Sequence, residues 1–592
     1  RCVAMKIYAI NNITFQRKLK NNEIADYQNT LQQAKFKIGN RGKSLLIVPT
    51  TSLPNETGVG NLGTKESLDF FEFAKTYWGI NEIQLLPIGQ YHNHNGEYPI
   101  YSGTSMDLGE QNINIKKYAN PEDYSKLIID KNNSNVRFEN VIDKDSPQEK
   151  LLHKIFEEGK YKKEFELFKK ENESRLEAKA LYRMLREINN SHDYKTWNDL
   201  DKNLFNSDIV NSDERQKRIQ EIKKIKNKEM DFYYFKQFLA EDSLKNAKNE
   251  LNKKGLKLDG DMLCGFSFDE IWANPKAFHK DTTIGWGLPA LDFESAEGEK
   301  LLKEKVKFYA EHFDGIRVDA AWTYISQPLY KGNEIKRQNY DNKILNIIEN
   351  EIKKYKGENF NNIMYEFATS PDNFNIYDGY NLKPCVKDRI KIYTSDYLSN
   401  DWGSNHAFLE RNWQPQSFII GATNHDSAPI SYNKEQADTL SGILKIPSSE
   451  LKNEKKFVSA KLAEPTSAHN NMIFFTNALG LKEKLLNNTD KTKNYTVQIP
   501  QNFESKYFDS LSKGDGYNPM DALIKNFKAK NLDKTDAKLY NKLIKYKKIL
   551  EQKEKQHLTI LSKIGLWSGG LTLSILFGLL LIKNNNKQKT EH

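Results

Sequence analysis

An acidic residue and an arginine stand together at the end of one apolar run. Asp319 follows the run Gly315-Ile-Arg-Val, and Arg317 lies two residues before it. Because strand side chains alternate, both side chains point to the same side of an extended chain. The guanidinium can keep the carboxylate ionised, as a nucleophile requires. A purely structural arginine–aspartate pair explains Asp319 and Arg317 equally well, so this motif alone leaves both interpretations open.

Two further apolar runs end in polar residues of the kind that do acid–base and binding chemistry. Glu366 follows Ile363-Met-Tyr, where desolvation is expected to raise its pKa toward that of a proton donor. His425 and Asp426 follow the run at 418–421, and both can hydrogen-bond vicinal hydroxyls of a sugar. Three successive runs that end in Asp, Glu and His-Asp are hard to attribute to packing, so together they predict one catalytic site.

Positioning these residues requires strands that end at a common face. Short apolar runs predict strands, and between them lie stretches with helical spacing of apolar residues. Repeated alternation of helix and strand favours a parallel (β/α)8 TIM barrel, whose catalytic face is formed by the carboxyl ends of the strands. The predicted strands cover 44–48, 83–87, 256–258, 315–318, 362–365 and 418–421, and the predicted helices include 68–78, 148–168 and 296–313.

Several further motifs resemble one known family. They are P-T-T-S-L-P at 49–54, G-V-G-N-L-G at 58–63, L-L-P-I-G at 85–89, G-D at 260–261, I-W-A-N-P at 271–275 and W-G-L-P at 286–289. These motifs are similar to those of the 4-α-glucanotransferases (amylomaltases, disproportionating enzymes) of glycoside hydrolase family 77, and more distantly to the α-amylase clan. The resemblance extends over roughly residues 40 to 505 and implies a TIM barrel.

The resemblance implies a role for each of the strand-end residues. Asp319 matches the nucleophile, Glu366 the general acid/base, and Asp426 the third carboxylate, which binds the donor sugar; Arg317 and His425 match supporting residues. The implied reaction transfers α-1,4-glucan segments between maltooligosaccharides by a retaining double displacement. No cofactor or metal is expected, because the sequence shows neither a metal-ligand spacing nor a phosphate-binding glycine loop.

Other residues are expected to contact the glucan. Trp286 and Trp272 are candidates for stacking on sugar faces, although tryptophans in such motifs equally serve barrel packing. Asp261 and Tyr101 complete the predicted binding residues. The chain departs from the family at 320–322, where Ala-Ala-Trp follows the nucleophile in place of His-Phe, and this change bears on substrate preference more than on reaction class.

Two other functions fit the same residues. An α-amylase-type hydrolase suits the strand-end carboxylates equally well, because the outcome depends on whether water or a sugar hydroxyl attacks second. A catalytically inactive, glucan-binding membrane protein is suggested by the altered motif flanks, whereas retention of all three carboxylates weighs against it.

Composition limits the remaining possibilities. The 592 residues carry a net charge of +10, and much of the lysine lies in Lys/Glu/Asn-rich helical stretches, so a nucleic-acid surface is not expected. Three widely separated cysteines, Cys2, Cys264 and Cys385, favour a reducing compartment over a disulfide framework. Oligomeric state is not predictable from the sequence.

The predicted organisation ends in a membrane anchor. Residues 564–582 are uncharged, and a helix of that length crosses a bilayer, so we expect a cytoplasmic catalytic domain tethered to a membrane. The expected segments are an N-terminal segment (1–39), the first part of the barrel (40–129), a helical insertion (130–228), the second part of the barrel with the catalytic residues (229–505), a charged helical stalk (506–562), a transmembrane helix (563–583) and a polar tail (584–592).

Overall fold

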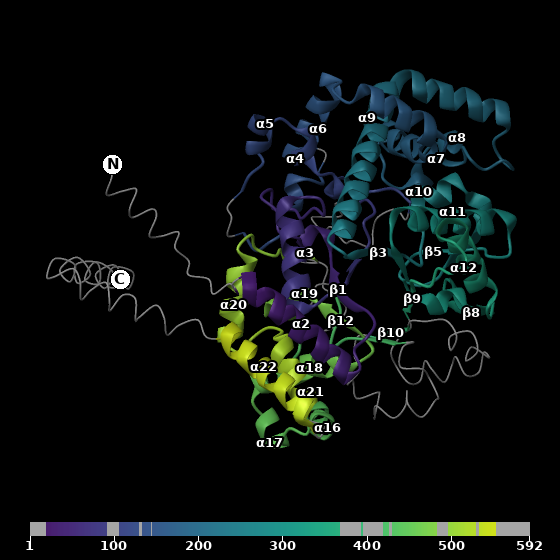
Figure 1. Cartoon of the computed structure of the whole chain (residues 1–592). Coiled ribbons are helices and arrows are strands. Elements are labelled where there is room, and N and C mark those ends of the chain that lie inside the picture. Colours follow the sequence, from purple (N-terminus) through teal and green to yellow (C-terminus); the bar gives the residue numbers. More distant parts are fainter. Residues whose placement is uncertain are drawn as a thin grey trace, which may run out of the picture.

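Eight parallel strands close into a barrel (Figure 1). The computed structural model describes residues 19, 21–91, 106–129, 133–143, 145–366, 392–394, 418–425, 429–481, 495–528 and 532–551. The strands follow one another around the barrel in sequence order, and β12 closes it by pairing with β1. They are β1 (Ser44–Val48), β2 (Glu82–Leu85), β3 (Lys257–Met262), β6 (Gly315–Val318), β9 (Ile363–Glu366), β10 (Ile392–Thr394), β11 (Phe418–Ile420) and β12 (Asn470–Phe474). The predicted TIM barrel is confirmed.

Six of the eight strands were predicted, and the two that were not are β10 and β12. The strand β12 begins with Asn470 and Asn471, which are typical of turns rather than strands. Both asparagines are buried at the amino-terminal end of the barrel, where their side chains satisfy backbone and hydroxyl groups. Asn471 Oδ1 accepts hydrogen bonds from Asn40 Nδ2 and Ser44 Oγ, both at 2.8 Å.

Helices pack around the barrel and are bounded by local signals. The helix α3 (Lys65–Trp78) begins after Thr64, whose side chain accepts from Ser67 N, and ends at Gly79 in the left-handed conformation (φ 65°). The helix α11 (Ala296–His312) begins after Ser295, whose hydroxyl caps Gly298 N at 2.9 Å. The predicted helices at 68–78 and 296–313 are therefore confirmed. The helix α12 (Lys343–Lys356) lies beside α11, between β6 and β9 in the chain.

The connection between β2 and β3 is mostly helical. Its longest helices are α6 (Pro147–Glu158), α7 (Lys162–Ile188) and α9 (Ser212–Lys253), and the short helix α8 (Asp199–Lys202) comes between α7 and α9 in the chain. The single helix expected over 148–168 is two helices, because Gly159 adopts a left-handed conformation (φ 65°) and ends α6. The helix α9 has one non-helical residue, Lys226, and then continues to Lys253 against β3. One helix thus belongs both to the expected insertion and to the barrel wall.

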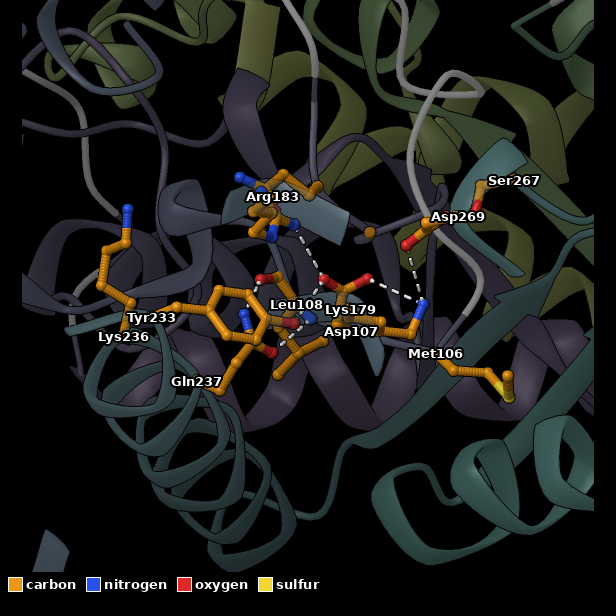
Figure 2. A network of polar contacts seen from close by, with 12 residues as sticks. Met106, Asp107, Leu108, Lys179, Arg183, Tyr233, Lys236, Gln237, Ser267 and Asp269 are labelled. Carbon is orange, nitrogen blue, oxygen red and sulfur yellow. Dashed lines mark hydrogen bonds and ion pairs between the residues drawn. The ribbon is translucent and has the colours of Figure 1, made fainter. Parts of the chain in front are cut away.

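Buried charges fasten these helices to the barrel (Figure 2). Lys179 of α7 lies 3.6 Å from Asp107 and 3.3 Å from Asp269, and Arg183 lies 3.1 Å from Asp107. Tyr233 of α9 donates a 3.0 Å hydrogen bond to the same aspartate. Burial by itself lowers the pKa of Lys179, but the surrounding carboxylates raise it above its ordinary value, so the lysine stays charged. Replacing Lys179 would leave Asp107 and Asp269 buried with less positive charge beside them.

A small antiparallel sheet lies outside the barrel. It has the order β5-β4-β7-β8 and consists of β4 (Phe278–Thr283), β5 (Pro289–Leu291), β7 (Ser326–Lys331) and β8 (Glu334–Asn339). Its strands come from the connections that follow β3 and β6, so it extends from the strand ends where catalytic residues are expected. This sheet was not predicted.

The helices between Phe503 and Glu551 pack on the outside of the barrel instead of forming the expected stalk. They are α20 (Phe503–Ser512), α21 (Pro519–Lys528) and α22 (Lys534–Glu551), and α21 and α22 contact α2 (Asn21–Ile38) (Figure 1). Tyr507 is buried against Phe73 and Trp78 of α3, with ring centroids 5.3 and 5.6 Å away. Several of the charged side chains that suggested a stalk, such as Lys538 and Lys545, are exposed, whereas Asp521 is buried and pairs with Lys525 and Lys547.

No helix within the described part of the chain is long and apolar enough to cross a bilayer. The predicted transmembrane segment, 563–583, lies outside the described residues.

Candidate active site

One buried arginine brings three carboxyl groups together at the carboxyl ends of β3, β6 and β9. Arg317 Nη1 donates to Asp261 Oδ1 at 2.5 Å and to Asp319 Oδ1 at 3.1 Å, and Nη2 lies 2.5 Å from Glu366 Oε1. The Arg317 and Asp261 side chains are fully buried, whereas those of Asp319 and Glu366 are 15% and 20% exposed. The two carboxyls predicted to do chemistry are therefore the ones that a ligand can reach.

Asp261 has a structural position in this cluster. Burial raises its pKa to about 8, while Arg317 acts in the opposite direction. Its Oδ2 atom is buried without a hydrogen-bond partner, which is consistent with a carboxyl group that carries a proton there. Because the Asp261 side chain is fully buried beneath Arg317, it orients the guanidinium and has no surface for a substrate. Sequence reasoning had expected Asp261 to bind substrate directly.

Backbone groups fix the two accessible carboxylates. Cys264 N donates to Asp319 Oδ2 at 3.3 Å, and Ala320 N donates to Glu366 Oε2 at 3.1 Å. Ala320 adopts a left-handed conformation (φ 42°, ψ 49°), which costs a non-glycine residue about 1 kcal/mol or more. In this strained turn the Ala320 N–H points toward Glu366. Both the backbone and Arg317 therefore connect Asp319 to Glu366.

A buried lysine supports the loop that follows β3. Lys305 of α11 is fully buried, and its Nζ donates to the carbonyl oxygens of Leu263 and, at 2.7 Å, Gly265. These carbonyls flank Cys264, whose amide contacts Asp319. Burial lowers the pKa of Lys305 to about 8. Sequence reasoning missed this residue, because a lysine within a Lys/Glu-rich amphipathic helix is indistinguishable from a surface lysine.

The remaining strand-end motif is described in part. His425 is buried after β11, together with Thr423 and Asn424. Asp426 and Tyr101, predicted as the third carboxylate and as a stacking residue, lie outside the described residues. Across the part of the chain that the structure covers, no group of three or more His, Cys, Asp or Glu residues is arranged to hold a metal ion.

The two tryptophans predicted to contact sugar differ in their surroundings. Trp272 of α10 (Phe268–Ala273) is 2% exposed, packs against Tyr182 and Phe205, and donates its indole N–H to Asp201 O at 2.9 Å. It is a packing residue beneath the inserted helices, so its prediction as a stacking residue is wrong. Trp286 is 69% exposed.

Comparison with known proteins identifies the relatives of this chain. The family model described as 4-alpha-glucanotransferase matches residues 48–320, which include Asp319. A 4-alpha-glucanotransferase of Clostridium butyricum is 24% identical over 344 residues, covering 51% of this chain and 66% of the relative. One of Streptococcus pneumoniae is 24% identical over 307 residues, covering 47% of this chain and 58% of the relative. The predicted resemblance to the 4-α-glucanotransferase family is confirmed.

Two solved amylomaltase structures have a fold similar to that of this chain. The amylomaltase from Streptococcus agalactiae in complex with acarbose has a TM-score of 0.62 at 15% identity, covering 81% of this chain and all of that one. The amylomaltase from Corynebacterium glutamicum has a TM-score of 0.56 at 12% identity, covering 88% and 77%. This chain resembles both amylomaltases in fold. The matches to the curated glucanotransferases, in contrast, extend over two thirds or less of their length.

Proposed function

We propose that this chain is a 4-α-glucanotransferase, which moves α-1,4-glucan segments between maltooligosaccharides by a retaining double displacement. The observation that carries the proposal is the single Arg317 guanidinium that holds Asp319 and Glu366 at neighbouring strand ends. Retaining enzymes need two carboxyl groups about 5 Å apart. Two carboxylates bound to the two ends of one guanidinium fork are close enough for that chemistry.

In the proposed first step, Asp319 attacks the anomeric carbon and Glu366 gives a proton to the departing glycosidic oxygen. The bond from the anomeric carbon to that oxygen breaks, and a covalent glucosyl–Asp319 ester forms. Two N–H donors, from Arg317 and Ala320, contact Glu366, and both stabilise a carboxylate. To act as proton donor, Glu366 therefore has to carry a proton when the glucan is bound, and the glycosidic oxygen takes the place of one of these contacts.

In the second step, Glu366 removes a proton from the 4-hydroxyl of an acceptor sugar, whose oxygen attacks the ester and releases Asp319. Transfer exceeds hydrolysis when the acceptor is positioned better than water. We propose that Trp286 contributes to glucan binding, that His425 and Asp426 hold donor hydroxyls, and that Tyr101 stacks on the donor sugar. Asp261 is proposed to act through Arg317.

Chromatography of the products from maltotriose tests this function, with Asp319→Asn as the control. Glucose together with oligomers longer than maltotriose, lost in the variant, is the expected result. Shortening to glucose and maltose alone would make the chain an α-amylase-type hydrolase. An unchanged substrate that still binds would support the inactive, glucan-binding alternative.

We further propose that residues 563–583 tether a cytoplasmic catalytic domain to a membrane. The proposal rests on the nineteen uncharged residues 564–582 between Lys563 and Lys583. Fractionation of the full-length protein beside a version that ends at Ser562 tests it. The full-length protein is expected with the membranes and the shorter version in the supernatant; two soluble proteins would refute the tether.

A further inference from the structure

An exposed aromatic pair stands next to the nucleophile. Among the large apolar side chains that the structure describes, Trp286 is the most exposed, at 69%. Trp322 is partly buried, and the two rings have centroids 6.0 Å apart with their planes inclined at 57°. Trp322 comes three residues after Asp319, so three residues of chain, at most about 10 Å, separate the two α-carbons. The pair therefore borders the candidate active site.

The backbone presents Trp286 to solvent at an energetic cost. Gly285, Trp286 and Gly287 all have positive φ, at 103°, 49° and 73°. A non-glycine residue in this conformation costs about 1–2 kcal/mol, and an exposed indole recovers little of it by packing. Strain combined with exposure is typical of a side chain held for a ligand rather than for the core.

Trp322 provides the fixed wall of the pair. It lies in the short helical turn η7 (Ala321–Tyr324) that directly follows the nucleophile strand, and its inner edge packs against the core. A rigid, partly buried ring beside a projecting one forms an open angle. Successive glucose units of an α-1,4-glucan are turned relative to one another, so two inclined aromatic faces match two successive sugar faces better than a flat surface would.

We propose that Trp322 and Trp286 form a binding site for two successive glucosyl units of the acceptor glucan. This inference rests on the function proposed above and assigns the site to one of its substrates. Once the donor is covalently attached to Asp319, only the acceptor depends on non-covalent affinity to displace water. An exposed aromatic platform beside the nucleophile provides this affinity for a chain that arrives from solvent. Trp322 thus sets the ratio of transfer to hydrolysis.

Full-length Trp322→Ala and Trp322→Phe variants test the site, with Ile335→Ala as a matched control. Ile335 lies on β8 of the adjoining small sheet and is 60% exposed. With maltotriose as substrate, Trp322→Ala is expected to raise the acceptor KM about ten-fold and to raise the share of hydrolysis, because a sugar–aromatic contact is lost. Trp322→Phe should keep most of the affinity, and Ile335→Ala should behave as the unmodified protein.

Calorimetric titration of maltoheptaose into the Asp319→Asn protein, with and without Trp322→Ala, separates this inference from the proposed function. Affinity that falls several-fold in the double variant supports the site even if the unmodified protein proves to be a hydrolase. Equal affinity in both proteins would overturn the inference, and so would an unchanged ratio of transfer to hydrolysis in Trp322→Ala when the unmodified protein is a transferase; neither result contradicts the glucanotransferase proposal.

Discussion

Glu464 is a buried acid whose replacement should stabilise the protein in alkaline solution. It lies at the end of α18 (Glu454–Ala463), is 5% exposed, and has one carboxyl oxygen without a hydrogen-bond partner. Burial raises its pKa to about 8, although the charge of Lys461 acts in the opposite direction. At neutral pH the folded protein therefore keeps this group protonated, whereas the unfolded chain releases the proton.

The size of the effect follows from the pKa difference between the two states. The pKa of Glu464 moves from 4.5 to about 8, and each unit corresponds to about 1.4 kcal/mol. The stabilising contribution is complete below pH 4.5 and is lost as the pH rises toward 8, for a total of about 5 kcal/mol. A glutamine has the same shape and no such proton, so Glu464→Gln should remove this pH dependence.

Thermal melts at pH 5 and pH 9 measure the prediction. With an unfolding entropy of about 2.1 cal/mol/K per residue, 5 kcal/mol corresponds to about 4 °C in a chain of 592 residues. Glu464→Gln should therefore melt about 4 °C above the unmodified protein at pH 9 and close to it at pH 5. Glu454→Gln, at the exposed start of the same helix, is the control. Equal shifts at both pH values, or in both variants, would refute the reasoning.

Substitutions at three further positions probe the site and the packing. Lys305→Met should lower kcat about ten-fold or more with little change in KM, because the loop that contacts the nucleophile loses its support. Lys303→Met, on the same helix, should leave kcat unchanged, and steady-state kinetics of both variants measures the difference. Arg317→Lys should reduce kcat/KM by about 100-fold, since one ammonium cannot bridge carboxylates on both sides, with circular dichroism as the check on folding. Tyr507→Ala should lower the free energy of unfolding by about 3–5 kcal/mol, because a buried aromatic ring is lost. Tyr507→Phe should lower it by about 1 kcal/mol, because this variant keeps the ring and loses the hydrogen bond to Tyr517 O. Urea titrations measure both changes.

The barrel was predictable wherever a strand is apolar throughout. The run 44–48 is buried at every position, as its apolar residues predict. The strand β12 was missed because its first two residues, Asn470 and Asn471, are polar. Their burial is possible because they form hydrogen bonds with residues more than 400 positions away, such as Asn40. No local pattern contains that information. The small sheet was missed for a similar reason, since β8 carries mostly exposed side chains and lacks a buried face.

The site was predictable as a set of residue types but not as a set of contacts. Alternation within a strand placed Arg317 beside Asp319, and the structure has this contact. Trp272 is covered by helices that lie more than 60 residues earlier in the chain. The motif around Trp272 therefore does not reveal that this side chain is buried. The role of Lys305 depends on the burial of one face of α11, whose composition is typical of a solvated helix.

The charge balance around Arg317 has a consequence for what the site can bind. Three carboxyl groups surround one guanidinium. With a proton on Asp261 and the proton that Glu366 needs as donor, the one remaining carboxylate balances the guanidinium. When Glu366 gives its proton to the departing oxygen, the group gains one negative charge, which a ring with positive charge at its anomeric carbon offsets. The site is therefore suited to a cation that exists only part-way through the proposed reaction, and sugar analogues with a protonated nitrogen near that carbon should bind more tightly than their neutral counterparts.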